Sequence, residues 1–426
     1  MSKYVISMVP VQIKERPHLG NIYDWVLIDF YSKLLRSEDN DVITPAIWNS
    51  LGHPITSLLR DRKMEVNPKN VDMLVAQYID KNERYLKDLN INFYPVYRDD
   101  KLKDELQYYL NNSYLGKIFE KNFAGKYCTS CDKILGTDMK IEKCKWCNSI
   151  VVDVISNGFF VNANINEIKQ KAEGIKFIPE NIKESMLNFA KVLPENYDVL
   201  VSKDRAYTVE IVINGKKVQL DPRFVTIMSV TLINNMHAGD PAHSIIIHGD
   251  VVKKFDYYNL VYNVSNAISS TIVGHGPCLG SDGKKVRAAN KGVSDTLDSL
   301  FENYSPQIVR GFLLSRDIDY PVFMSESSIE EVKTVKNRLS RVINELKNHN
   351  VKNSSILNYD NINTASYDFH NSSREFRLHR AFMSIAHIIK DVNKNYLPKL
   401  KSSNLQTDSN LIKLIEVMHN LYFGGN

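Results

Sequence analysis

The first 45 residues restrict the fold most, because their apolar pattern changes period twice. Residues 5–9 are a short apolar run that ends at Pro10, as expected of a buried strand leading into a loop. From residue 21 to residue 36 apolar side chains recur at near-helical spacing, and residues 41–45 have the pattern of a second strand. Strand, loop, helix and strand in this order open a parallel sheet, so we predict an α/β fold.

The remainder of the chain continues this pattern and then becomes helical. We predict a helix over residues 71–86 and strands at 92–97, 207–212 and 244–249. The longest apolar run, residues 224–233, has the length of a strand and is shorter than the roughly 18 residues of a membrane span. Beyond residue 292, a possible capping box at 327–330 and apolar faces along 329–346, 382–389 and 411–421 predict a C-terminal helical bundle.

Composition indicates a globular chain of two or three domains, with 426 residues, 43% hydrophobic and 24% charged. The net charge of +5 is too small to indicate a nucleic-acid-binding protein by itself. Residues 331–426, however, hold 14 Lys or Arg against 8 Asp or Glu, a local excess of six positive charges. We therefore expect any polyanionic partner at the C-terminal part, and the candidate phosphate contacts there are Arg338, Arg341, Arg374, Arg377 and Arg380. The last three lie three residues apart, which favours a patch on one helical face; a solvated helix face is the alternative interpretation. The first ten residues lack a long apolar core, so we expect a cytoplasmic protein without a membrane segment.

Four of the five cysteines lie within twenty residues, as two C-x-x-C pairs separated by twelve residues. This spacing allows Cys128, Cys131, Cys144 and Cys147 to place four thiolates around one tetrahedral Zn²⁺. Four protein ligands leave no open position for catalysis, so we predict one structural zinc that stabilises a small segment. A redox role for the cysteines is the alternative, and Cys278 has the character of a buried small apolar residue.

A second motif, residues 17–21, lies after the first strand and at the start of the first helix. A helix N-terminus favours phosphate, Gly20 allows a nucleotide to approach the backbone, and His18 can donate to phosphate oxygens. A histidine that only caps the helix is the alternative interpretation.

Several segments resemble class I aminoacyl-tRNA synthetases, and methionyl-tRNA synthetases in particular, in the same order over nearly the whole chain. Residues 10–21 resemble the HIGH-motif region, and residues 127–147 are similar to the zinc knuckle of the connective insertion. Residues 157–160, with a paired phenylalanine, and residues 198–203 resemble two further segments of the family. Residues 283–289 lie where the KMSKS loop belongs, and residues 308–316 resemble the L-R-Y-x-L-L segment that follows it.

The resemblance implies a class I synthetase Rossmann-like (HUP) parallel sheet with a zinc-knuckle connective insertion and a C-terminal α-helical bundle. It also implies a ligase that activates an amino acid with ATP and Mg²⁺ and transfers it to tRNA bound through the basic C-terminal helices. The residues that the resemblance assigns are His18, Asn21 and Lys285 as catalytic, Pro10, Gly20, Asp250 and Arg287 at the nucleotide, and Trp48 and Asn49 at the amino acid.

The sequence departs from the family pattern at two positions that bear charge. The KMSKS position reads Lys285-Val286-Arg287-Ala288-Ala289. It therefore lacks the second lysine of the motif, and it lacks both of its serines. The acidic residue expected to pair with the substrate ammonium is Asn49, which brings no opposing charge. Three hypotheses therefore stay open: a tRNA synthetase, a relative that acylates another acceptor, and a catalytically silent paralogue that binds RNA or a partner.

We predict four regions from these patterns. They are a first half of the Rossmann-like domain at 1–112, a zinc-binding insertion at 113–160, the second half at 161–295, and a helical bundle like an anticodon-binding domain at 296–426.

Overall fold

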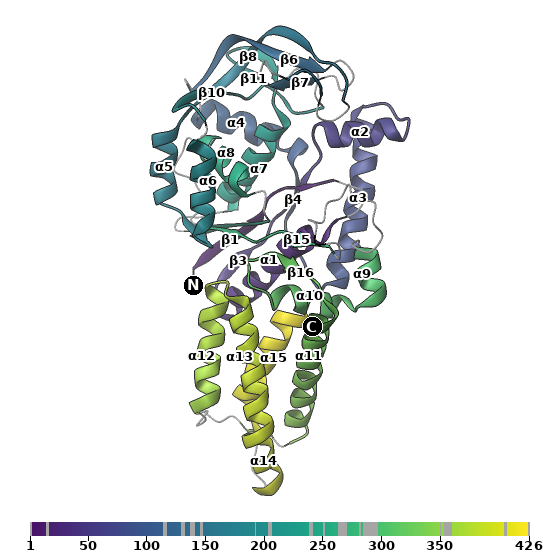
Figure 1. Ribbon diagram of the computed structural model, residues 1–426, viewed down its shortest axis with the longest axis vertical. Helices are drawn as coiled ribbons and strands as arrows, with labels where there is room; N and C mark the ends of the chain where they lie inside the picture. Colours follow the sequence, from purple (N-terminus) through teal and green to yellow (C-terminus); the bar gives the residue numbers. More distant parts are fainter. Residues whose placement is uncertain are drawn as a thin grey trace.

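The computed structural model describes most of the chain, and all structural statements below concern these residues. They are residues 2–13, 17–113, 117–128, 133–136, 141–144, 148–191, 193–202, 207–237, 242–249, 252–262, 271–280, 283, 297–349, 351–352, 360–403 and 407–424. The molecule is elongated, with an α/β body between an antiparallel sheet at one end and a helical bundle at the other (Figure 1).

A five-stranded parallel sheet forms the centre of the body. Its order is β3-β1-β13-β14-β9, and every neighbouring pair is parallel. The strands are β1 (Lys3–Met8), β3 (Asp41–Ile43), β9 (Lys176–Ile178), β13 (Ala242–His248) and β14 (Thr271–Gly274). Because the early strand β1 pairs with the late strand β13, the two halves of the α/β body form one sheet. The predicted α/β fold is confirmed.

Helices cover both faces of the sheet, and the central residues of its strands are accordingly apolar. Along β13, Ile245 and Ile247 belong to the core shared with α1 (Leu19–Ser37) and the bundle. Ile246, which points to the opposite face, belongs to a second core with α7 (Pro222–His237) and α8 (Val252–Tyr262). The alternation along one strand therefore joins two hydrophobic cores.

Beyond the carboxyl end of β1 the sheet continues as a small three-stranded parallel sheet. It consists of β2 (Val11–Gln12), β4 (Ala46–Asn49) and β5 (Val96–Arg98) in the order β2-β4-β5. The helices around it are α2 (His53–Asp61), α3 (Pro68–Asp88), the 3₁₀ turn η1 (Asp99–Lys101) and α4 (Lys103–Ser113). The predicted helix at 71–86 lies within α3, whereas the predicted strand at 92–97 forms only from residue 96.

An antiparallel sheet of order β10-β8-β6-β7 lies at the end of the molecule farthest from the bundle (Figure 1). Its strands are β6 (Ile118–Cys128), β7 (Lys133–Gly136), β8 (Val152–Asn164) and β10 (Asn196–Leu200). The helices α5 (Ile165–Glu173) and α6 (Asn181–Lys191) then lead back to the body. In the chain this sheet falls between β5 and β13, as expected of an inserted unit; the domain boundaries at 112, 160 and 295 stay predictions.

Two local predictions about residues 207–233 need correction. The apolar run 224–233 is not strand-like but forms most of α7, whose described side chains are buried from residue 224 to residue 234. A short, uniformly apolar segment has the same pattern in a buried strand and in a helix buried on all sides. The strand predicted at 207–212 forms as β11 (Glu210–Ile213), but it pairs with β12 (Lys216–Gln219) in an antiparallel hairpin outside the parallel sheet.

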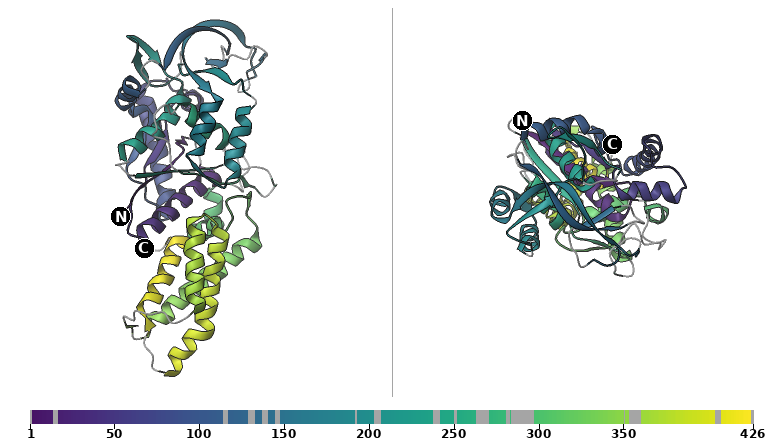
Figure 2. Two further views of the ribbon diagram at one scale, coloured as in Figure 1. Left: turned by 90° about the vertical axis from the view of Figure 1, so that its left-hand side faces the viewer. Right: turned by 90° about the horizontal axis from the view of Figure 1, so that it is seen from above.

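The predicted helical bundle forms the other end of the molecule, seen from the side in Figure 2. It consists of α11 (Glu326–Lys347), α12 (Asp360–Arg374), α13 (Leu378–Asp391), η3 (Val392–Tyr396), α14 (Leu397–Ser403) and α15 (Ser409–Phe423). All six predicted apolar positions of α11 are buried. The capping box begins two residues earlier than predicted, with Ser325 as the N-cap and Ser328 as its partner.

Short elements connect the body to the bundle. They are β15 (Cys278–Leu279), α9 (Leu297–Asn303), α10 (Pro306–Leu314) and β16 (Val322–Phe323), with β17 (Val351–Lys352) and β18 (Thr407–Asp408) inside the bundle region. Among the helices described here, none combines the length and the apolar character needed to cross a membrane.

Candidate functional site

In the sheet, β1 has β3 as its neighbour on one side and the much later strand β13 on the other. The strand order therefore changes direction between β1 and β13, and their carboxyl ends lie side by side there. Open α/β sheets bind ligands at such a crevice. We call this place the nucleotide edge. It consists of the N-terminus of α1, the end of β13 at His248, and the end of β14 at Gly274. The last two are tied together, since the His275 backbone N–H donates to the His248 carbonyl at 3.1 Å.

His18 is the N-cap of α1, so the capping interpretation is confirmed. Its Nδ1 accepts from the Asn21 backbone N–H at 3.3 Å, and the Asn21 side-chain oxygen accepts from the His18 N–H at 3.4 Å. Because Nδ1 is an acceptor, a neutral imidazole carries its proton on Nε2. Capping therefore fixes the ring in the tautomer whose Nε2–H can donate to an anion at the helix N-terminus. The two interpretations of His18 are compatible.

Gly20 packs closely against the His18 side chain in this structure. A Cβ at position 20 would lie 3.1 Å from both Cε1 and Nδ1 of the imidazole, so the glycine makes room for the ring. Pro10 is buried between β1 and β2. Lys285, Arg287 and Asp250, which were also assigned from the sequence, lie outside the described residues.

Two histidine–aspartate pairs at the nucleotide edge were not found from the sequence. His248 is buried, with Nε2 3.0 Å from Oδ1 of Asp256 and Nδ1 3.0 Å from the Gly249 carbonyl. Burial alone would lower the pKa of His248, but the Asp256 carboxylate outweighs it and raises the pKa to about 9. His275 has the same arrangement, with Nε2 3.0 Å from Oδ1 of Asp24 and Nδ1 2.7 Å from the Gly276 carbonyl.

The second pair joins the end of β14 to α1. The His275 ring contacts Tyr23 in a tilted arrangement, with 4.3 Å between centroids and 43° between ring planes, and a Cβ at Gly249 would lie 3.1 Å from the His275 ring. Residues 275–279 lead toward the Lys285 segment, and they are also fastened by main-chain bonds from Gly276 to Ile318 and from Val322 to Pro277. The pair therefore sets the base of that segment against the helix that carries His18.

Trp48 and Asn49 end β4 on the same side of the molecule. Trp48 is buried and meets Trp25 edge to face at 6.3 Å, so it supports the core under the crevice. Both sides of the Asn49 amide are engaged: Oδ1 accepts from the Leu51 N–H at 3.1 Å and Nδ2 donates to Thr226 Oγ1 at 3.1 Å. The amide is therefore held in one orientation.

The carboxyl group of Asp99 is linked to Asn49 through Thr226, whose Oγ1 contacts both side chains. Asp99, fully buried, accepts from the backbone N–H and hydroxyl of Ser50 at 2.9 and 3.0 Å, and its other oxygen is 3.1 Å from Thr226 Oγ1. Burial raises the pKa of Asp99 to about 7 in spite of these donors. The sequence offered one signal, since Asp99 directly follows β5 at the carboxyl edge of a parallel strand.

The raised pKa of Asp99 predicts a specific pH dependence of folding stability. Because the folded state holds the proton up to pH 7 and the unfolded chain releases it near pH 4, this group lowers stability as pH rises from about 4 to about 7. Asp99→Asn should remove this contribution, since an amide oxygen can accept from Ser50 and the amide N–H can donate to Thr226. Urea unfolding of both proteins at pH 5, 6, 7 and 8 measures it. Parallel curves would contradict the assignment.

Two of the four cysteines of the predicted zinc site lie in the described residues. Cys128 and Cys144 are buried in one small cluster with Val151, apart from the two main cores. Cys128 ends β6 opposite Lys133 in the β6–β7 hairpin, and Cys144 opens a tight turn in which its N–H donates to the Ser149 carbonyl at 2.8 Å. Each C-x-x-C pair thus has one buried thiol at a hairpin.

The structure does not show the zinc site itself. Cys131 and Cys147 lie outside the described residues, and the described residues contain no group of three or more metal-ligating side chains. The zinc ligand set therefore stays a prediction.

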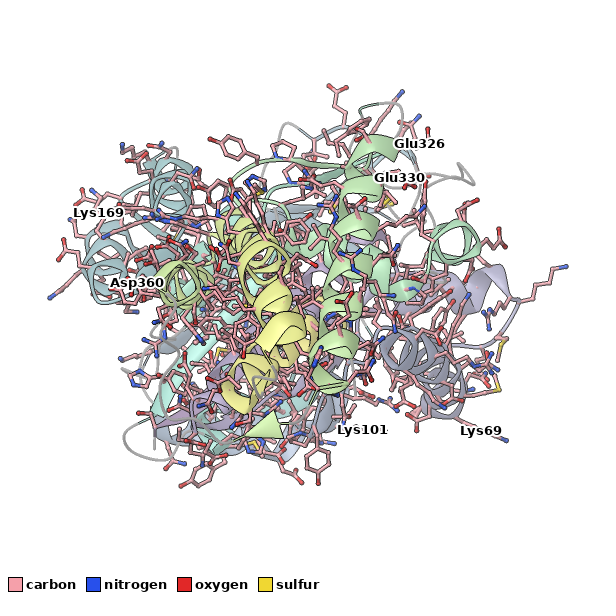
Figure 3. The ribbon with its side chains drawn as sticks, turned by 90° about the horizontal axis from the view of Figure 1, so that it is seen from below. Lys69, Lys101, Lys169, Glu326, Glu330 and Asp360 are labelled. Atoms are coloured by element: carbon pink, nitrogen blue, oxygen red, sulfur yellow. The ribbon has the colours of Figure 1, made fainter. Side chains whose placement is uncertain are left out.

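The arginines proposed for contact with a polyanion do not form the expected patch. Arg374 ends α12, Arg377 precedes α13 and Arg380 lies within α13, so their three-residue spacing is not that of one helical face. Each is paired with a carboxylate, at 2.9, 3.1 and 3.5 Å respectively. Seen from below (Figure 3), acidic side chains such as Glu330 of α11 and Asp360 of α12 lie on opposite sides of the bundle. The bundle surface is therefore mixed in charge.

Comparison with known proteins supports the fold. Residues 4–153 match the family model described as tRNA synthetases class I (M). A leucine–tRNA ligase of Aliarcobacter butzleri is 25% identical over 202 residues, which are 46% of this chain and 23% of that protein. A methionine–tRNA ligase of Methanococcus aeolicus is 26% identical over 150 residues, 34% of this chain and 22% of that protein. The matched segments thus span about a quarter of these relatives.

Solved structures share the fold over the whole chain. Methionyl-tRNA synthetase of Mycobacterium tuberculosis, bound by methionyl-adenylate, superposes with a TM-score of 0.74 at 14% identity, covering 99% of this chain and 92% of that one. The leucyl-tRNA synthetase of Agrobacterium radiobacter K84, in a ternary complex with tRNA and LeuAMS, gives a TM-score of 0.69 at 10% identity, covering 99% and 84%. The chain is thus similar to class I aminoacyl-tRNA synthetases, in sequence over residues 4–153 and in fold over nearly its whole length, with methionyl and leucyl enzymes among the proteins it resembles.

Proposed function

We propose that this protein activates an amino acid with ATP, as an enzyme related to methionyl-tRNA synthetase, and transfers the acyl group to tRNA. In the first step a carboxylate oxygen of the amino acid attacks the α-phosphorus of Mg²⁺-bound ATP. Pyrophosphate leaves with the electrons of the broken P–O bond, and an aminoacyl-adenylate forms. Methionine is the first substrate to test, and leucine the second.

The observation that carries this proposal is His18 at the N-cap of α1, at the crevice between β1 and β13. Phosphoryl transfer requires donors held where charge develops, and here capping fixes the ring while the helix N-terminus adds its own N–H groups. Asn21 holds the ring through the capping box. The Asp24–His275 pair holds the segment after β14 against this helix, and we assign Lys285, further along the chain, to the ATP phosphates.

Two further parts of the molecule, the cysteine segment and the C-terminal bundle, have roles outside the nucleotide edge. A zinc ion bound by Cys128, Cys131, Cys144 and Cys147 would stabilise the insertion and supply no catalytic group. The tRNA would contact the basic C-terminal bundle, with positive side chains outside the paired arginines providing the phosphate contacts.

Asn49 supports a second candidate function, a repurposed or silent relative. Its amide is locked between Leu51 and Thr226 and carries no charge, while the Asp99 carboxyl beneath it is sealed from solvent. An amino-acid ammonium would find a weaker partner here than a carboxylate. Such a relative would acylate a different acceptor, or would bind RNA or a partner protein without activating an amino acid.

Amino-acid-dependent ATP–pyrophosphate exchange separates these functions. We expect exchange with one of the twenty amino acids when zinc-loaded protein is used. Exchange followed by acylation of tRNA supports the synthetase. Exchange without acylation of tRNA supports another acceptor, and no exchange with any amino acid in a folded protein refutes activation.

Replacing His18 should separate its two roles. His18→Asn keeps a good N-cap, because asparagine is among the preferred capping residues, but removes the imidazole donor. We expect exchange to fall about 100-fold with little change in melting temperature. His18→Ala should show the same loss of exchange and also lose about 1 kcal/mol of stability with the cap. Equal exchange in His18→Asn and wild type would show that His18 only caps the helix.

Asn49→Asp tests whether this position meets an ammonium group. If it does, the added carboxylate should lower the KM for the amino acid about tenfold and leave the KM for ATP unchanged. Asn49→Ser is the matched control, since it removes the amide without adding charge. An unchanged amino-acid KM in Asn49→Asp would place the ammonium elsewhere.

A further inference from the structure

A cavity of about 760 Å³ lies at the β3 edge of the sheet, away from the nucleotide edge. It extends from α1 across β3 to the segment after α3 and the end of α7. Its lining consists of Asp29, Lys33, Arg36, Val42, Ile43, Thr44, Asn90, Asn92, Tyr94, Pro95, Tyr97 and His237. The residues of β3 that it touches are paired with the first half of β1, whereas the nucleotide edge lies beyond the other end of that strand. The volume is that of a pocket for a molecule of nucleotide size.

The charged side chains of this cavity leave an excess of positive charge on its α1 wall. Asp29 is neutralised from the buried side by Arg310, whose Nη2 lies 2.6 Å from its carboxylate. Lys33, one turn further along α1, also contacts Asp29 at 2.9 Å, and Arg36 follows it with an exposed side chain. The wall itself therefore holds two cations and one carboxylate, whose charge the buried Arg310 already offsets. An anion would therefore be attracted to Lys33 and Arg36.

Opposite this wall, the cavity has an apolar, aromatic rim. Tyr94, which lines the cavity, is 77% exposed, so its ring is accessible to a ligand. The residues next to the lining Pro95 and His237 in the chain, Val96 and Met236, are also exposed. Tyr97 closes the floor, where its hydroxyl lies 2.6 Å from Nε2 of His237.

We propose that this cavity binds a nucleoside monophosphate, with the phosphate at Lys33 and Arg36 and the base on Tyr94. A phosphate matches the two cations, and a planar base matches an exposed tyrosine because every base has a face that stacks. Asn92, also in the lining and exposed, offers an amide to polar groups of the ligand, whereas the Asn90 amide donates to the Gly424 carbonyl at 2.8 Å. This site is separate from the proposed ATP site and does not depend on it.

Calorimetric titration with AMP tests the proposal, in wild type and in the His18→Asn protein, so that binding at the nucleotide edge is identified separately. We expect one AMP site whose affinity is the same in wild type and in the His18→Asn protein. Arg36→Gln and Tyr94→Ser should each weaken that site about tenfold. Arg84→Gln, at an exposed arginine of α3 outside the cavity lining, is the matched control and should bind AMP like wild type.

Three further probes complete the test. Adenosine should bind at least tenfold more weakly than AMP, because it lacks the phosphate. Inorganic phosphate should compete with AMP only at higher concentration, because it lacks the base. A short RNA that binds this site more tightly than AMP would identify an RNA nucleotide as the source of the same chemistry. AMP binding that neither Arg36→Gln nor Tyr94→Ser weakens would overturn the proposal, whatever the result of pyrophosphate exchange.

Discussion

Arg310→Met is expected to lower the free energy of unfolding by about 3–5 kcal/mol, the range found when one partner of a buried ion pair is removed. Arg310 is fully buried in α10 and contacts the Asp29 carboxylate of α1 at 2.6 Å. Its Nη2 also donates to the Leu421 carbonyl of α15 at 2.8 Å. One guanidinium therefore joins the α/β body to two helices on the bundle side.

The expected loss arises mainly at the partners that remain. Without Arg310, Asp29 keeps only Lys33 as a cation, and the pKa of that lysine is already lowered by its own burial. Asp29→Asn should therefore recover part of the loss in the Arg310→Met background, since it removes the uncompensated carboxylate. Urea unfolding of the two single variants and the double variant measures this coupling.

Arg338→Met is the matched control, because Arg338 is an exposed arginine on α11 and its loss should change stability by no more than about 0.5 kcal/mol. If Arg310→Met were as stable as Arg338→Met, the body and bundle would be held together by their apolar contacts alone.

Local patterns were sufficient to predict much of the fold. The apolar run of residues 5–9, the near-helical apolar spacing of residues 21–36 and the strand pattern of residues 41–45 correctly predicted β1, α1 and β3. The same holds for α11, with its six buried apolar positions. The prediction was wrong for residues 224–233, which are buried on all sides and so have no period. It was also wrong for the arginines of 374–380, because nothing in their spacing marks the break between α12 and α13.

The candidate site was less accessible to sequence reasoning, because its charges come together over long distances in the chain. His18 and Asn21 are three residues apart, and their capping box could be expected from the motif. By contrast, His275 and Asp24 are 251 residues apart, and Asp99 and Thr226 are 127 apart. Such pairs depend on the strand order β1-β13-β14 and on the packing of α7, which no local pattern specifies.

The second large effect is expected at the cysteine segment. Wild-type protein should contain one zinc per chain, and Cys144→Ser should contain less than about 0.1, since loss of one thiolate of four removes most of the affinity. Cys144 is buried with Cys128 in a cluster of few apolar side chains, so the metal would provide most of the stability of this unit. Limited proteolysis should accordingly cleave the variant within residues 118–164 and leave the body intact.

Cys278→Ser serves as the control, because Cys278 is equally buried but belongs to the main core of the body. It should retain the zinc and the wild-type cleavage pattern while losing some global stability. Zinc retained at one per chain in Cys144→Ser would exclude this thiol as a ligand. The redox interpretation would instead be supported if wild-type protein contained no zinc and lost about 4 Da in mass on mild oxidation, as two disulfides form. Because Cys128 and Cys144 lie in one cluster beside two hairpins, in an insertion with little other core, we expect the metal.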